Sequence, residues 1–193
     1  MVRRYVVTGA PGAGKTVLVA GLRARGVAVV AEAATDVIAA SQAEGVEQPW
    51  TQAWFCDRIA VLQRKREIAA VAGSVTEQVF DRSPLCTLAL AHYLDQPVGP
   101  VLAGEVDRVV RERVYESVVF LVRPLGFVEA TAARRISYPE SLVFERVHET
   151  VYREHGFRLV DIPPGPVPAR VDQVLSLIGR RQEPEGAAAD EPG

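Results

Sequence analysis

Residues 9 to 16 read Gly9-Ala10-Pro11-Gly12-Ala13-Gly14-Lys15-Thr16 and match the pattern G-x-x-x-x-G-K-[ST]. They lie between the apolar run Tyr5-Val6-Val7 and a helix-forming stretch from Val17 to Arg25. A strand before the pattern and a helix after it are the setting in which such a loop binds phosphate. Glycines let the backbone curl with its N–H groups pointing inward, and the following helix presents its positive end to the anion. All eight residues are therefore predicted to bind the phosphates of a nucleotide.

The last two residues of the pattern have separate expected roles. Lys15 is expected to reach the β- and γ-phosphate oxygens, and Thr16 to supply a hydroxyl ligand to the Mg²⁺ that bridges them. The chain contains 20 arginines but only two lysines, Lys15 and Lys65, so its preference for arginine is relaxed at the motif position. A chance match in a chain rich in Gly and Ala is the alternative, and the strand and helix on either side argue against it. ATP and Mg²⁺ are the ligands expected here.

The composition limits the class of protein. A chain of 193 residues with 48% apolar content fits one α/β domain. The formal net charge of −2 and the lack of a basic cluster longer than Arg64-Lys65-Arg66 argue against a nucleic-acid partner. Cys56 and Cys86 are too few for a disulfide framework and are expected to be buried thiols. No apolar stretch approaches the ~20 residues of a membrane span and no signal peptide is visible, so we expect no membrane partner and a cytoplasmic location.

Five short, mostly valine-rich runs are predicted to be strands, as expected for strands buried on both faces. They are Tyr5 to Thr8, Val27 to Glu32, Val75 to Asp81, Val118 to Arg123 and Phe157 to Ile162. Helical periodicities alternate with them, which predicts an α/β fold with a doubly wound parallel sheet. The long intervals 33–73 and 124–156 are predicted to add helices that cover a substrate. Residues 1–181 are predicted to form the domain, and residues 182–193 a disordered tail.

Acidic residues and arginines that follow the predicted strands are candidate site residues, because ligands of open α/β sheets bind at the carboxyl ends of the strands. Asp81 could hold the Mg²⁺ shell and Arg82 could contact a transferring phosphoryl group or a substrate oxygen. A purely structural ion pair between them is the alternative. Glu32 could accept the proton of an attacking hydroxyl. It could instead be an acid that interacts with a helix dipole.

Several other residues have both a functional and a structural interpretation. Arg134 and Arg135 could close over the phosphates and spread the transition-state charge, or could belong to a solvated helix face. Arg123 and Asp161 are not assigned to catalysis. The interval 33–73 contains three aromatic residues close together, Trp50, Trp54 and Phe55. One of them could stack on a planar substrate, but aromatic residues at helical spacing are more often core residues. The three histidines are expected to be structural or exposed; they are His92, His148 and His155.

Four motifs together give the chain a family resemblance. These are the phosphate-binding loop, Glu-Ala-Ala from Glu32, Phe-Asp-Arg-Ser-Pro from Phe80, and Tyr-Arg-Glu-His-Gly-Phe-Arg-Leu-Val-Asp-Ile-Pro from Tyr152. From Val2 to about Gly179 the chain resembles the small AAA-type ATPase/kinase-like P-loop family. It is similar to the kinase portion of bacterial nicotinamide riboside kinases and, more distantly, to deoxynucleoside kinases. After Glu32 those last enzymes carry a proline and a tryptophan, whereas Ala33-Ala34-Thr35-Asp36 follows here, which argues against deoxynucleoside specificity.

The resemblance implies a three-layer P-loop NTPase fold whose five-stranded parallel sheet has the order 2-3-1-4-5. The third strand would lie beside the strand that precedes the loop, which would bring Asp81 near Lys15 and Thr16. The resemblance also implies that Glu32 occupies the general-base position and that Arg82 contacts the reacting oxygens. By the same resemblance, Arg134 and Arg135 would belong to the lid.

Two functions remain open at this level. The first is a kinase that transfers the γ-phosphoryl group of ATP to a hydroxyl of a small molecule, for which a nucleoside-like compound is one option. The second is a regulatory NTPase or switch that acts on a protein partner. A guanine-reading Asn/Thr-Lys-x-Asp motif would indicate a GTPase, but neither lysine lies in one. An inactive scaffold is a third reading, against which the intact Lys15, Thr16 and Asp81 argue.

Overall fold

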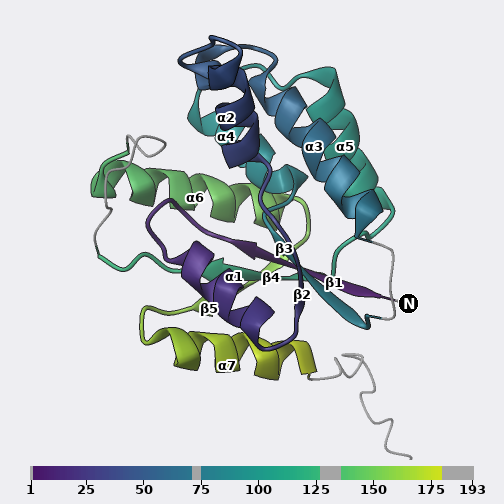
Figure 1. The fold of residues 1–193 in the computed structure, drawn as a ribbon, viewed down its shortest axis with the longest axis vertical. Helices are drawn as coiled ribbons and strands as arrows, with labels where there is room; N and C mark the ends of the chain where they lie inside the picture. The colour runs from purple at the N-terminus through teal and green to yellow at the C-terminus, as the bar shows by residue number, and fades with distance from the viewer. Residues whose placement is uncertain (1, 71–74, 127–135, 180–193) are drawn as a thin grey trace, which may run out of the picture.

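The computed structural model describes residues 2–70, 75–126 and 136–179, which form one parallel sheet with helices on both faces (Figure 1). The sheet order is β2-β3-β1-β4-β5, so the predicted strands, their parallel pairing and their order are confirmed. The strands are β1 (Arg3–Thr8), β2 (Ala28–Val30), β3 (Glu77–Asp81), β4 (Val118–Val122) and β5 (Arg158–Ile162). Because β2 has only three residues, Glu32 lies two residues beyond its end rather than on it.

Seven α-helices lie in the described part of the chain. They are α1 (Lys15–Ala24), α2 (Ala34–Ala43), α3 (Phe55–Ala69), α4 (Pro84–Tyr93), α5 (Pro100–Arg111), α6 (Tyr138–Glu154) and α7 (Val167–Gly179), with a 3₁₀ turn at Pro49–Thr51. The first long interval contains α2 and α3, and the second contains α6, as expected for inserted helices. The predicted tail, 182–193, and its boundary lie outside the described residues.

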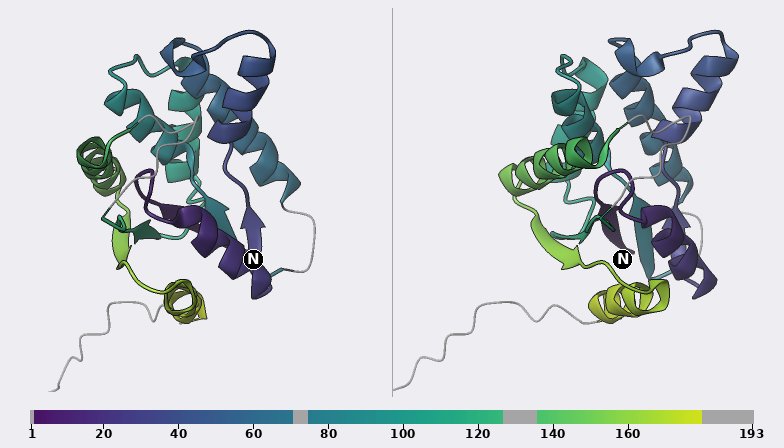
Figure 2. Two further views of the ribbon diagram at one scale, coloured as in Figure 1. Left: turned by 60° about the vertical axis from the view of Figure 1, so that its left-hand side comes forward. Right: turned by 90° about the vertical axis from the view of Figure 1, so that its left-hand side faces the viewer.

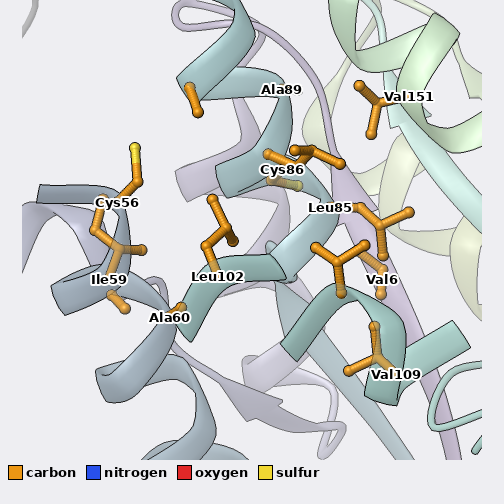
Figure 3. Packing of buried hydrophobic residues seen from close by; sticks show 14 of the residues in the cluster. Val6, Cys56, Ile59, Ala60, Leu85, Cys86, Ala89, Leu102, Val109 and Val151 are labelled. Carbon is orange, nitrogen blue, oxygen red and sulfur yellow. The ribbon is translucent and has the colours of Figure 1, made fainter. Parts of the chain in front are cut away.

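The helices form two layers, one on each face of the sheet (Figure 2). Successive side chains of a strand point to opposite faces, so a strand buried on both sides must be apolar throughout. In β1, Tyr5 and Val7 pack with α1 and α7, whereas Val6 packs with the larger layer of α3, α4, α5 and α6. Figure 3 shows this second core, where Val6 lies near Leu85 of α4 and Val109 of α5. The valine-rich runs thus reflect two cores that share one sheet.

The two cysteines and the apolar character of the helices can be compared with what the composition predicts. Cys56 and Cys86 are both buried and unpaired with each other, which confirms the prediction of buried thiols. Over the three described stretches, no helix has both the length and the apolar character that a bilayer crossing requires.

Candidate functional site

The phosphate-binding loop connects the end of β1 to the start of α1. Gly12 and Gly14 have positive φ angles of 83° and 79°, which L-residues with side chains rarely adopt. Gly14 directly precedes Lys15, the first residue of α1, so the positive end of this helix faces the loop. The glycine conformations are thus those that a loop between a strand and a helix requires here, whereas phosphate binding by residues 9–16 stays a prediction.

Position 9 requires glycine for two reasons, its backbone conformation and the close approach of β4. Its φ is 137°, and a Cβ at this position would lie 2.5 Å from the carbonyl oxygen of Val122 in β4. We expect Gly9→Ala to lower the free energy of unfolding by about 2–4 kcal/mol, since backbone strain and overpacking add. Gly45→Ala is the matched control, because Gly45 also has a positive φ but has open space around it. It should cost only about 1 kcal/mol. Equal losses in chemical denaturation would contradict the steric argument.

Lys15 is a buried cation inside this loop. Its side chain is almost fully buried and its Nζ donates a hydrogen bond to the carbonyl oxygen of Ala10 at 2.7 Å. Burial lowers the pKa of Lys15 well below its usual range, and the neighbouring Arg82 lowers it further. Phosphate oxygens would reverse both effects, because they would pair with the ammonium group. The position therefore suits an anion.

Glu32, Asp81 and Arg82 meet Lys15 and Thr16 around one cavity of about 360 Å³. The helix α2 also contributes to the lining, with apolar surface from residues such as Ile38. The lining thus includes residues other than those of the predicted phosphate-binding loop. The sequence prediction that these residues come together agrees with the geometry, whereas their chemical roles remain predictions.

Burial raises the pKa of Asp81, although Arg82 and Lys15 oppose this shift. A hard cation such as Mg²⁺ would favour the ionised carboxylate and would suit the Asp81 carboxylate together with the Thr16 hydroxyl. No cluster of three or more His, Cys, Asp or Glu side chains that could hold a metal occurs among the residues described. Mg²⁺ does not need such a cluster, because phosphates and water usually supply most of its ligands. The residues present therefore fit a Mg²⁺–phosphate complex.

Arg82 has an unusual backbone. Its φ is 80°, in the left-handed region that costs an arginine energy, and its backbone N–H donates to the carbonyl oxygen of Val7 at 3.1 Å. Its Nε lies 3.8 Å from Oε1 of Glu32, whose other oxygen accepts a hydrogen bond from the Thr35 hydroxyl at 3.0 Å. The close acidic partner of Arg82 is thus Glu32 rather than the Asp81 carboxylate, which was the structural alternative. Strained non-glycine residues of this kind concentrate at functional sites.

The other predicted residues fall outside this cluster. Arg134 and Arg135 lie outside the described residues, so the structure does not place them. Arg123 pairs with Glu145 of α6 at 2.8 Å and with Asp161 of β5 at 3.0 Å, which is a structural role. Phe55 is a core residue, and Trp50 and Trp54 pack against the same core rather than lining the cavity.

Sequence reasoning missed Arg170 of α7. This side chain is almost fully buried and its Nη2 donates to the carbonyl oxygen of Ala13 in the loop at 2.9 Å. No carboxylate in the described ranges pairs with it, and burial lowers its pKa. A signal was available, because Arg170 precedes Val174 and Ile178 by four and eight residues. It therefore falls on the buried face of α7.

His148 of α6 was expected to be structural or exposed, and its contact with Arg82 was not predicted. The ring is fully buried beside Arg82, with His148 Nε2 3.3 Å from Arg82 Nη1. The two residues are 66 positions apart in the sequence, and no sequence motif contains both of them. His92 is exposed and His155 half-buried, in line with the expectation for these two histidines.

The sequence matches the protein family described as AAA domain over residues 4–170. No curated protein matches it. Among solved structures, the chain is similar to deoxyadenosine kinase from M. mycoides bound to dCMP and dCDP. The TM-score is 0.57 at 13% identity, over 91% of this chain and 98% of that one.

Two further solved structures share the architecture. The NadR protein in complex with NAD and AMP-PNP matches with a TM-score of 0.66 at 15% identity, over 96% of this chain and 52% of NadR. Thymidylate kinase from Candida albicans matches with a TM-score of 0.54 at 9% identity, over 92% of this chain and 91% of that one. At such identities the likeness concerns the fold. The chain therefore belongs to the AAA domain family and has a P-loop kinase-like fold.

Proposed function

We propose that the protein is an ATP-dependent phosphotransferase that moves the γ-phosphoryl group of ATP to a hydroxyl of a small, nucleoside-like molecule. The nucleotides named with two of the similar structures, AMP-PNP with NadR and dCDP with deoxyadenosine kinase, support a nucleotide as ligand. The kinases among these structures support phosphoryl transfer as the reaction class.

The proposal assigns the site residues as follows. The loop amides and Lys15 bind the β- and γ-phosphates, and Thr16 and Asp81 hold Mg²⁺, which neutralises charge during the transfer. Arg82 contacts the oxygens of the transferring group. Glu32 orients the acceptor hydroxyl and takes its proton. Arg134 and Arg135 are proposed to close over the phosphates.

One observation carries this proposal. Glu32 lines the same cavity as Lys15 and Arg82, just before α2, where its Oε2 accepts a hydrogen bond from the Thr35 hydroxyl at 3.0 Å. A carboxylate at this place is useful if a second molecule with a hydroxyl enters the cavity beside the phosphates. A switch that only hydrolyses a nucleotide has less use for this carboxylate.

The test is nucleotide turnover with Mg·ATP in the presence and absence of a panel of hydroxyl-bearing acceptors that includes ribonucleosides and deoxynucleosides. We expect at least one acceptor to raise ADP release and to gain the mass of one phosphoryl group. The expected rate falls when EDTA removes Mg²⁺. If no acceptor stimulates turnover while a protein partner does, the kinase proposal fails and the regulatory NTPase is supported.

A further inference from the structure

Arg82 is held from two directions by different kinds of group. On one side Glu32 faces its Nε at 3.8 Å, and on the other side His148 faces its Nη1 at 3.3 Å. The Glu32 side belongs to the cavity. His148 comes from α6, does not line the cavity and is completely buried. Its ring also lies against Phe144, with 4.4 Å between the ring centroids.

The hydrogen bonds fix the protonation form of His148. A guanidinium group can only donate, so Nε2 must accept from Arg82 and the ring proton must lie on Nδ1. That Nδ1 lies 2.9 Å from the carbonyl oxygen of Phe144, to which it donates. Burial lowers the pKa of His148 to about 3, and the charge of Arg82 contributes. The imidazole is therefore neutral at neutral pH.

A neutral acceptor has a particular advantage beside an arginine that must bind phosphate. A second carboxylate in this buried position would orient Arg82 but would add to the negative charge that Glu32 already places beside its Nε. An apolar side chain would leave this end of the guanidinium without a fixed direction. Imidazole orients the group and adds no negative charge.

The backbone around Arg82 is anchored to the same helix. Ser83 follows Arg82, and its hydroxyl lies 2.7 Å from the hydroxyl of Tyr152, one turn after His148 on α6. Tyr152 also contacts the Sγ of Cys86 at 3.1 Å. Two residues of one face of α6 thus hold the strained segment: Tyr152 through the side-chain hydroxyl of Ser83, and His148 through the Arg82 guanidinium.

We propose that His148 is a positioning residue for phosphoryl transfer, which aims the Arg82 guanidinium into the cavity through a neutral acceptor. This inference rests on the proposed function, since it assigns to Arg82 a task in the transfer. It concerns the transition state rather than nucleotide binding. The main effect of losing His148 should therefore fall on kcat.

The test compares His148→Gln with His148→Met. Both side chains are about as long as histidine, but only glutamine offers an oxygen that can accept from Arg82. We expect His148→Met to lower kcat by roughly 10-fold with the dissociation constant of ATP within about 2-fold of wild type, and His148→Gln to recover most of that loss. His155→Gln is the control. His155 is the residue that caps the C-terminus of α6, and its Nδ1 is 2.7 Å from the carbonyl oxygen of Val151, but no contact joins it to Arg82. It should keep wild-type kinetics.

Melting temperatures of all three variants separate positioning from stability. Equal kcat losses in His148→Gln and His148→Met, or losses that follow only the melting temperature, would overturn the proposal. A second readout does not need turnover. ¹⁵N NMR should show His148 protonated on Nδ1 with Nε2 as acceptor, and the Nε2 signal should shift in Arg82→Met. If the wild-type enzyme has no transferase activity, the function fails while this signature still tests the contact, and its absence would overturn the positioning role.

Discussion

Lys15→Ala is expected to weaken the binding of Mg·ATP by at least about 100-fold, because it removes a charged donor from the proposed phosphate site. The reason is local. The ammonium is buried in the loop, where it donates a hydrogen bond to the carbonyl oxygen of Ala10, and burial lowers its pKa. A bound triphosphate would supply oxygens that pair with this ammonium group and favour its charged form. Isothermal titration calorimetry with ATP and Mg²⁺ is the measurement.

The control for this prediction is Lys65→Ala. Lys65 is the other lysine of the chain and is exposed on α3, away from the loop. Its removal changes the net charge by the same amount and should leave the affinity for ATP unchanged. Thermal unfolding gives a second measure, since a ligand at 100 times its dissociation constant stabilises a protein by about 2.7 kcal/mol. Lys15→Ala should lose this stabilisation. An affinity that remains within a few-fold of wild type would contradict the phosphate-binding role.

The strands of the sheet could be predicted from the sequence because each strand is marked by residues next to one another in the chain. Each strand is a run of apolar residues, and the loop at residues 9–16 has a pattern whose glycines meet conformations that other residues avoid. The strand order is a non-local property, and it came with the family resemblance rather than from spacing. The β2 prediction was too long at both ends, because Val27 to Glu32 is apolar nearly throughout while only Ala28–Val30 pairs with β3.

The candidate site shows the same division. Asp81, Arg82 and Glu32 could be found because each lies at or just beyond the carboxyl end of a strand, and parallel strands end at one edge of the sheet. His148 could not be found this way, since it lies in the middle of a helix and meets Arg82 only when α6 packs against α4. Arg170 occupies the buried face of α7, but no periodicity shows that this face meets the loop. Residues such as these reach the site through packing between helices, which the sequence near the strand ends does not predict.

Glu32→Gln should lower kcat for phosphoryl transfer by about 10²–10⁴-fold and leave the affinity for Mg·ATP nearly unchanged. Glutamine keeps the size of the side chain and an oxygen that can accept the Thr35 hydrogen bond, but it cannot take a proton from an acceptor hydroxyl. The loss should therefore fall on the chemical step. Steady-state kinetics with the acceptor found in the panel would give kcat and KM, and calorimetry would give the affinity for ATP.

The division between kcat and KM also separates two roles for Glu32. Loss of a general base should lower kcat and kcat/KM together. Loss of a residue that only binds the acceptor should raise KM and leave kcat unchanged. Glu44→Gln is the matched control, since Glu44 is an exposed glutamate that pairs with Arg58 at 3.2 Å and lies outside the cavity. Full transfer activity in Glu32→Gln would remove Glu32 from the chemistry. In that case Asp81, the other carboxylate of the cavity, would have to serve as both magnesium ligand and base.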